Sequence, residues 1–107
     1  MNDAALHSRL MARLAKLGVE ERPWPGRDDG ASSLICRGKE VAHFHHPNEL
    51  DLRLGKQTIQ REKLVHPRDS NVHPKRAKGS PWIELRLVSD ADVAKIARLV
   101  EIAIADL

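Results

Sequence analysis

The sequence predicts an α+β fold: a two-layer open sandwich with a mostly antiparallel sheet and helices on one face. The first and last segments carry apolar residues at helical spacing, and short alternating runs separated by turn residues lie between them. The chain has 107 residues, of which 41% are hydrophobic, and this length suits a single domain over residues 1–107. The predicted order is therefore helix, strands, helix, strand, helix.

Residues 3–17 are predicted to form the first helix, because leucines recur there at helical spacing and make one stripe. Gly18 suits the left-handed position that often follows a helix end. His7 lies off the stripe, so we expect it to be exposed to solvent. Residues 19–22 are predicted to form a short edge strand that Pro23 ends. The stripe consists of Leu6, Leu10, Leu14 and Leu17.

Trp24 lies between two prolines and is expected to cover the edge of the core, with stacking on a ligand as the alternative. Two strand-like runs, "SSLIC" and "KEVAHFHH", follow and flank Arg37–Gly38, which predicts a tight turn. The single cysteine, Cys36, lies in an apolar run and is expected to be a small core residue. One cysteine permits no internal disulfide, so a cytoplasmic setting is expected.

The second half of the chain continues this pattern. Residues 50–54, "LDLRL", alternate and predict a strand whose leucines share one face. Residues 55–65 predict a short helix, and residues 66–81 a long irregular segment that we expect to be mobile. The run "WIELRLV" predicts a strand, and Ser89 is expected to cap a final helix with Asp92 in a capping box.

The net charge of +3 at pH 7 is unevenly distributed, because residues 56–79 carry seven Lys or Arg but two acidic residues. A basic segment attracts nucleic acid or acidic partners, and Lys75, Arg76 and Lys78 are its candidate phosphate contacts. No apolar run approaches the length that spans a bilayer, and the N-terminus lacks the pattern of a secretory signal. No membrane partner is therefore expected.

The face that the histidines of "HFHHPNE" occupy depends on the length of the loop between two strands. Opposed residues of a hairpin share a face, so an odd-numbered loop pairs Phe44 and His46 with the leucines of 50–54. An even-numbered loop would bury His43 and His45 among these leucines and expose Phe44. Burying two imidazoles without partners is costly. We therefore predict the odd-numbered loop, with His43 and His45 opposite the core.

The sheet face opposite the core then collects unlike polar groups and is the candidate binding surface. A histidine beside a carboxylate can act as a general base. His43 and His45 occupy alternate strand positions, so both can reach one metal ion. His66 is expected to join this face from the irregular segment. The candidate residues are His43, His45, Asp51, Arg53, His66, Trp82, Glu84 and Arg86.

The sequence has features that favour metal binding and features that oppose it. The stretch resembles the first cupin motif, His-x-His followed by Glu, but the gaps to the flanking glycines are short and a second histidine motif is absent. A third ligand would have to come from His66 or His73. We therefore predict no metal and no cofactor, and His43 and His45 remain the candidate ligands if a metal binds.

Three stretches, "HFHHPNELDLRL", "REKLVHPRDSNVHP" and "PWIELRLVSDADVAKIARLVEIA", together resemble a family of small bacterial luciferase-like proteins, or luciferase domains. The similarity extends over nearly the whole chain. The resemblance implies an α+β fold, and it implies neither a settled activity nor light emission. The positions that match the family pattern form a candidate site without assigned roles: His43, His45, Asp51, His66, Pro67 and Trp82.

Three functions fit these features. The one we favour is a module that binds a small ligand or a protein partner with the open sheet face and the His-Pro loop. The second is nucleic-acid binding through residues 56–79, with Trp82 as a stacking platform. The third is an enzyme that uses His43 or His45 as a base or metal ligand, although the sequence contains no nucleophile elbow, P-loop or dinucleotide fingerprint.

Overall fold

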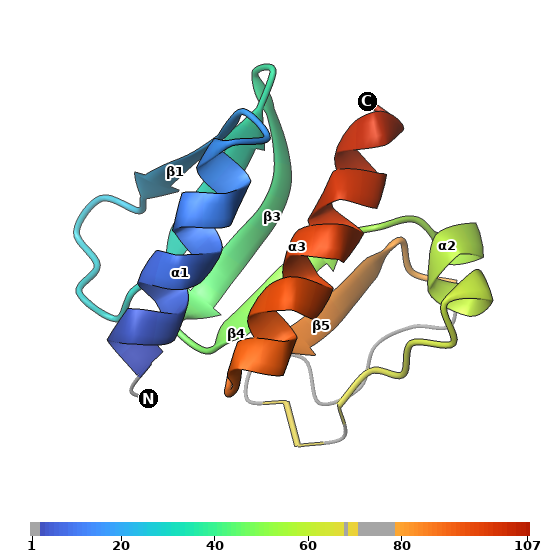
Figure 1. The fold of residues 1–107 in the computed structure, drawn as a ribbon. Helices are drawn as coiled ribbons and strands as arrows, with labels where there is room; N and C mark the ends of the chain where they lie inside the picture. The colour runs from blue at the N-terminus through green and yellow to red at the C-terminus, as the bar shows by residue number, and fades with distance from the viewer. Residues whose placement is uncertain (1–2, 68, 71–78) are drawn as a thin grey trace.

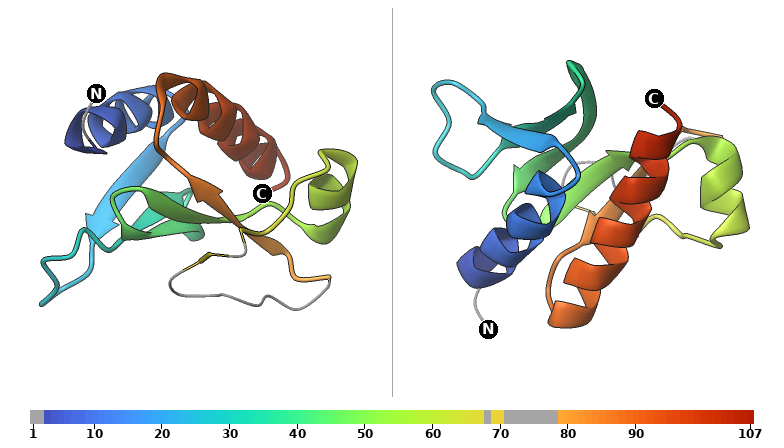
Figure 2. Two further views of the ribbon diagram at one scale, coloured as in Figure 1. Left: turned by 90° about the horizontal axis from the view of Figure 1, so that it is seen from below. Right: turned by 45° about the horizontal axis from the view of Figure 1, so that its top comes forward.

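The computed structural model describes residues 3–67, 69–70 and 79–107 of the chain. It confirms the two-layer α+β fold, in which an antiparallel sheet of order β1-β2-β3-β4-β5 carries α1 and α3 on one face (Figures 1 and 2). None of the described helices has the length and apolar composition that crossing a membrane requires. In chain order the elements are α1 (Asp3–Ala15), β1 (Val19–Pro23), β2 (Ser32–Cys36), β3 (Lys39–His46), β4 (Glu49–Arg53), α2 (Lys56–Arg61), β5 (Trp82–Arg86) and α3 (Asp90–Ala105).

The core lies between the sheet and the two long helices. The leucine stripe of α1 faces it as predicted, and the apolar side of α3 packs against the same cluster. Cys36 is buried there, which confirms its predicted role as a small core residue. The core residues contributed by β2 to β5 include Leu34, Cys36, Val41, Ala42, Phe44, Leu50, Leu52, Ile83 and Leu85.

His7 is half-buried, so the prediction that it faces solvent is wrong. Its side chain is 21% exposed, and its Nε2 lies 2.9 Å from Glu21 Oε2. β1 runs beside α1 (Figure 1) and brings Glu21 to the flank of the helix, where Ser32 Oγ also donates to it. The hydrogen bond from His7 lowers the pKa of Glu21, outweighs the opposite effect of burial, and is reinforced by the bond from Ser32.

A tight turn connects β2 and β3. Arg37 and Gly38 both have left-handed backbone angles, with φ of 51° and 77°, as the two central residues of a hairpin turn commonly do. This confirms the predicted turn between β2 and β3. The turn also fixes which residues of β3 lie beside β2, and it therefore contributes to the geometry of the open face.

The turn between β3 and β4 contains two residues, 47–48, so the predicted odd-numbered loop is wrong. A β-bulge restores the parity, because His45 is an extra residue of β3 that has no register partner on β4. His43 therefore faces away from the core, as predicted. His46 pairs with Glu49 and does not join the leucines, which corrects its predicted position.

The second half of the chain agrees with the predictions in part. α2 ends at Arg61, well before the end of the predicted helix over residues 55–65. Ser89 caps α3 as predicted, and Asp92 completes the capping box. Part of the predicted irregular segment over residues 66–81 lies outside the described residues. The same holds for His73 and for the predicted phosphate contacts Lys75, Arg76 and Lys78.

Candidate functional site

The candidate site lies on what we call the open face, which is the face of the sheet opposite α1 and α3 (Figure 2). The register of β3, β4 and β5 places His43, Asp51 and Glu84 in one row across this face. The next row contains Glu49 and Arg86. Paired strands therefore hold these side chains, and strands fix a site more rigidly than loops do.

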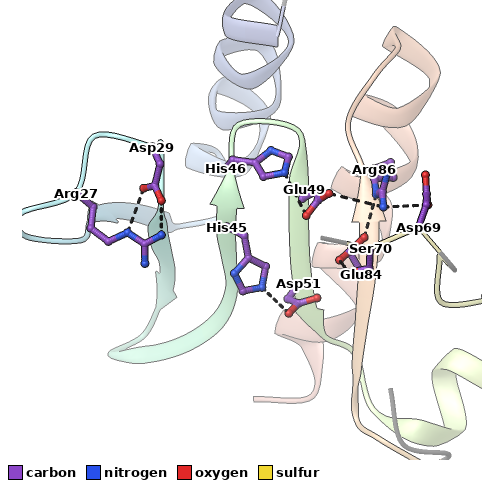
Figure 3. A network of polar contacts seen from close by, with 10 residues as sticks. All are labelled: Arg27, Asp29, His45, His46, Glu49, Asp51, Asp69, Ser70, Glu84 and Arg86. Atoms are coloured by element: carbon purple, nitrogen blue, oxygen red, sulfur yellow. Dashed lines mark hydrogen bonds and ion pairs between the residues drawn. The ribbon is translucent and has the colours of Figure 1, made fainter. Parts of the chain in front are cut away.

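Asp51 lies at the centre of the first row, with a side chain that is 1% exposed. Its Oδ2 lies 2.9 Å from His45 Nε2 (Figure 3) and 3.4 Å from His43 Nε2. The two imidazole rings meet edge-on, with centroids 4.8 Å apart. Because His45 is the bulge residue, the bulge turns its ring toward the carboxylate that His43 already faces. One buried oxygen is thus shared by two histidines.

A chain of polar contacts reaches His43 from the β1–β2 side of the sheet. Trp24 Nε1 donates to Ser33 Oγ at 2.8 Å, and Ser33 Oγ donates to Glu40 Oε2 at 2.5 Å. Glu40 Oε1 in turn lies 3.5 Å from His43 Nδ1. Trp24 therefore belongs to the open face, and the prediction that it covers the edge of the core is wrong. Its indole centroid lies 6.0 Å from the His43 ring, and that of Trp82 lies 4.9 Å from it.

A second polar cluster occupies the neighbouring part of the open face (Figure 3). Arg86 donates to Glu84 Oε2 at 2.9 Å and lies 3.7 Å from Glu49 Oε1, and both carboxylates are 1% exposed. Ser70 Oγ donates to Glu84 Oε1, and His46 Nε2 lies 3.2 Å from Glu49 Oε2. Burial has the largest single effect on Arg86 and lowers its pKa, but the hydrogen bond with Glu84 and the charges of nearby carboxylates together outweigh it and raise the pKa of Arg86.

The other two predicted residues are Arg53 and His66. Arg53 is exposed at the end of β4 and pairs in register with Trp82. His66 is half-buried and begins the segment that reaches the open face at Ser70. The structure therefore brings together His43, His45, Asp51 and Trp82, places Glu84 and Arg86 in the adjoining cluster, and leaves Arg53 exposed.

Sequence reasoning missed several residues of the open face. Strand alternation could have identified Glu49, because it lies two positions before Asp51 on β4. Alternation could not have identified Glu40, since it lies three positions before His43 and both intervening residues are buried. Ser33 contacts Glu40 through a β2–β3 register that shifts between Leu34 and Ile35, and such a shift is invisible in the alternation.

This arrangement is suited to three kinds of chemistry. A histidine held by a buried carboxylate has the geometry of a general base with its orienting group, as in the His45–Asp51 contact. Two imidazoles and a carboxylate are also a common donor set for a divalent transition metal. The indoles of Trp24 and Trp82 offer flat faces on which a planar molecule can stack.

A groove lies on the other side of the molecule. It has a volume of about 610 Å³ and runs between α1 and α3, and its lining combines apolar residues with basic ones. The groove contains no histidine and a single carboxylate, so it lacks the paired groups that acid–base or metal chemistry requires. We therefore place the candidate site on the open face. The lining includes Arg13, Leu17, Ala97, Arg98, Glu101 and Ile102.

Strands β3, β4 and β5 of the open face lie within a match to a known family. The family model of the Luciferase domain matches residues 38–103, which is more than half of the chain. The chain belongs to the Luciferase domain family. The match confirms the resemblance found in the sequence. The matched residues include His43, His45 and Asp51, whereas Trp24 precedes them. No curated protein and no solved structure matches the chain.

Proposed function

We propose that this luciferase domain is a small-molecule binding module whose site is the His43–His45–Asp51 cluster on the open face. The observation that supports it is the burial of three carboxylates there, because Glu49, Asp51 and Glu84 are each 1% exposed. Removing an ion pair from water costs roughly several kcal/mol, and apolar residues of similar volume are often at least as stabilising. Such costly groups are concentrated at functional sites.

The walls of the site indicate the class of ligand. Trp24 and Trp82 both contact the ring of His43, which itself lies beside Asp51. Flat aromatic surfaces favour a planar ligand, and a few convergent polar groups fix its orientation. We therefore expect a planar molecule with a hydrogen-bonding edge, of which a nucleobase is one example, that presents this edge to His45 and Asp51.

Tryptophan fluorescence tests this proposal directly, because the two tryptophans of the chain both contact His43. The protein is titrated with nucleosides, planar aromatic acids and aliphatic acids of the same charge. We expect a saturable fluorescence change with at least one planar compound and none with the aliphatic acids.

Matched histidine variants provide the control for this titration. His45→Gln should weaken the planar ligand at least tenfold, whereas His7→Gln, which alters a histidine–carboxylate contact on the helix-covered face, should leave its affinity unchanged. Linear, unsaturable quenching by every compound, or equal effects of the two variants, would contradict the proposal.

Nucleic-acid binding stays a separate prediction, since Lys75, Arg76 and Lys78 lie outside the described residues. It predicts weak, salt-sensitive binding, because phosphate contacts release counterions. Replacing these three residues by alanine should then reduce both the affinity for single-stranded DNA and its dependence on salt. An unchanged affinity in molar salt would contradict it.

A further inference from the structure

We propose that His43, His45 and Asp51 bind one divalent transition-metal ion of the zinc class, to which a planar ligand can then attach. This inference rests on the proposed binding site and adds its resident ion. Its basis is the separation of the donor atoms, the orientation of His43 and the residues that hold Glu40.

The donor atoms of the three residues converge. One ligand atom from each of the three residues lies within 4.8 Å of the other two. Zinc binds imidazole nitrogen and carboxylate oxygen at about 2.0 to 2.2 Å, so two ligands of one ion stand roughly 3 to 4 Å apart. The three donor atoms need to move only slightly closer together. All three side chains are also largely withdrawn from water, at 17%, 12% and 1% exposure for His43, His45 and Asp51.

His43 is oriented between two carboxylates. Its Nε2 faces Asp51 at 3.4 Å, and its Nδ1 faces Glu40 at 3.5 Å. A neutral imidazole has one N–H and can donate to only one of these groups. A cation bound at Nε2 leaves the proton on Nδ1, which is buried without a hydrogen-bond partner among the described residues and lies 3.5 Å from Glu40 Oε1. The histidine–carboxylate arrangement behind a metal ligand has this form in many zinc sites.

Glu40 is itself held in place. Ser33 Oγ donates to Glu40 Oε2 at 2.5 Å, and Trp24 Nε1 donates to Ser33 Oγ at 2.8 Å. A carboxylate fixed in this way can orient the ring of His43 and strengthen it as a ligand. The site thus has three ligands on strands and a supporting layer behind one of them.

The donor set also indicates the type of ion. Two imidazoles with one carboxylate favour zinc, cobalt, nickel or iron, whereas magnesium and calcium prefer oxygen ligands alone. Three protein ligands leave at least one coordination position open in a four-coordinate ion. That position is where the polar edge of a planar ligand would bind, beside Trp82, whose ring lies 4.9 Å from that of His43.

The test uses the full chain after treatment with a chelator, titrated with Zn²⁺ by calorimetry and with Co²⁺ by visible absorption. We expect one ion per chain and a cobalt spectrum typical of nitrogen and oxygen ligands. His45→Gln and Asp51→Asn should each weaken zinc at least 100-fold, and Glu40→Gln should weaken it about 10- to 100-fold as a change behind a metal ligand does. Circular dichroism checks that each variant remains folded.

Two control variants separate this site from adventitious binding to histidines. His7→Gln alters the histidine on α1, and His46→Gln alters the one beside Glu49, so both should retain the zinc affinity. Zinc affinity that is unchanged in Asp51→Asn, or no binding at all, would overturn the metal proposal. If planar ligands still bind the metal-free protein, the binding module stands and the metal proposal falls. If zinc binds as expected and no planar compound does, the metal proposal stands without the module.

Discussion

Two histidine–carboxylate contacts on opposite faces of the same sheet differ in their surroundings. His7 and Glu21 meet at 2.9 Å beneath α1, and His45 and Asp51 meet at 2.9 Å on the open face. The Glu21 side chain is 27% exposed, whereas that of Asp51 is 1% exposed and is also faced by His43. The distance alone therefore does not identify a functional site. What distinguishes the second contact is complete burial of one carboxylate between two imidazoles.

The covered face and the open face also differ in how they treat charge. The covered face is packed with aliphatic side chains, and its polar contacts lie at the margin of the core. The open face buries Glu49 and Glu84 as well as Asp51. The comparison suggests that the first face stabilises the fold, and that the second keeps charged groups whose removal from water is unfavourable unless each has its partner.

The largest expected loss of stability comes from Arg86→Met, which disturbs the buried charges of the open face. Arg86 contacts both Glu49 and Glu84, and removing one member of a buried charge cluster typically costs about 3 to 5 kcal/mol. We expect the free energy of unfolding, measured by urea denaturation, to fall by about 3 kcal/mol. Arg9→Met removes an ion pair whose members are both 57% exposed, so it should cost less than about 1 kcal/mol. Equal losses would show that burial does not matter here.

A glycine substitution next to the β3–β4 turn should have the next largest effect on stability. Gly30 has a φ of +81°, and a Cβ there would meet the Pro47 ring at 2.7 Å. Gly30→Ala should therefore cost about 2 kcal/mol, the sum of backbone strain and displacement of the β3–β4 turn.

Gly18, at the end of α1, offers a matched control for that substitution. Its φ is +85°, but a Cβ there would meet nothing within 4 Å. Gly18→Ala should accordingly cost about 1 kcal/mol, from strain alone. Urea unfolding measures both losses. A smaller loss for Gly30→Ala than for Gly18→Ala would indicate that the turn moves without cost.

The smallest effect concerns Glu21, whose pKa is lowered by the hydrogen bond from His7. Because the folded pKa lies below the ordinary value of 4.5, the stabilisation is fully present above that pH and is lost as the pH falls through the folded pKa. Glu21→Gln should cost about 1 kcal/mol at pH 7. The difference from the native chain should shrink at pH 3. A difference that grows on acidification would contradict the assigned role of Glu21.

The sequence was sufficient to predict the element order and the faces of the strands. Leucine spacing located α1, the Ser89–Asp92 box located the start of α3, and alternation placed Asp51 and Glu84 opposite the core. These patterns are local, and each follows from the period of one element. The family resemblance was likewise contained in contiguous stretches of the chain.

The details that build the site could not be read from local periods. The bulge at His45 depends on the pairing of two strands, and it compensates for a turn whose length was predicted wrongly. His7 was assigned to solvent because its partner, Glu21, belongs to a different element. The contact of Glu40 with Ser33 requires the β2–β3 register. Each miss is a contact between elements, which the period of a single element does not encode.

Histidine NMR can observe the open-face histidines and His7 in the same sample. Side-chain NMR of histidine, with resonances assigned through single variants, is recorded while Zn²⁺ and then a planar ligand are added. The account predicts that His43 and His45 respond together and saturate at one equivalent of zinc, and that His7 does not change. A uniform response of His7, His43 and His45, or a response of His7 alone, would contradict the account.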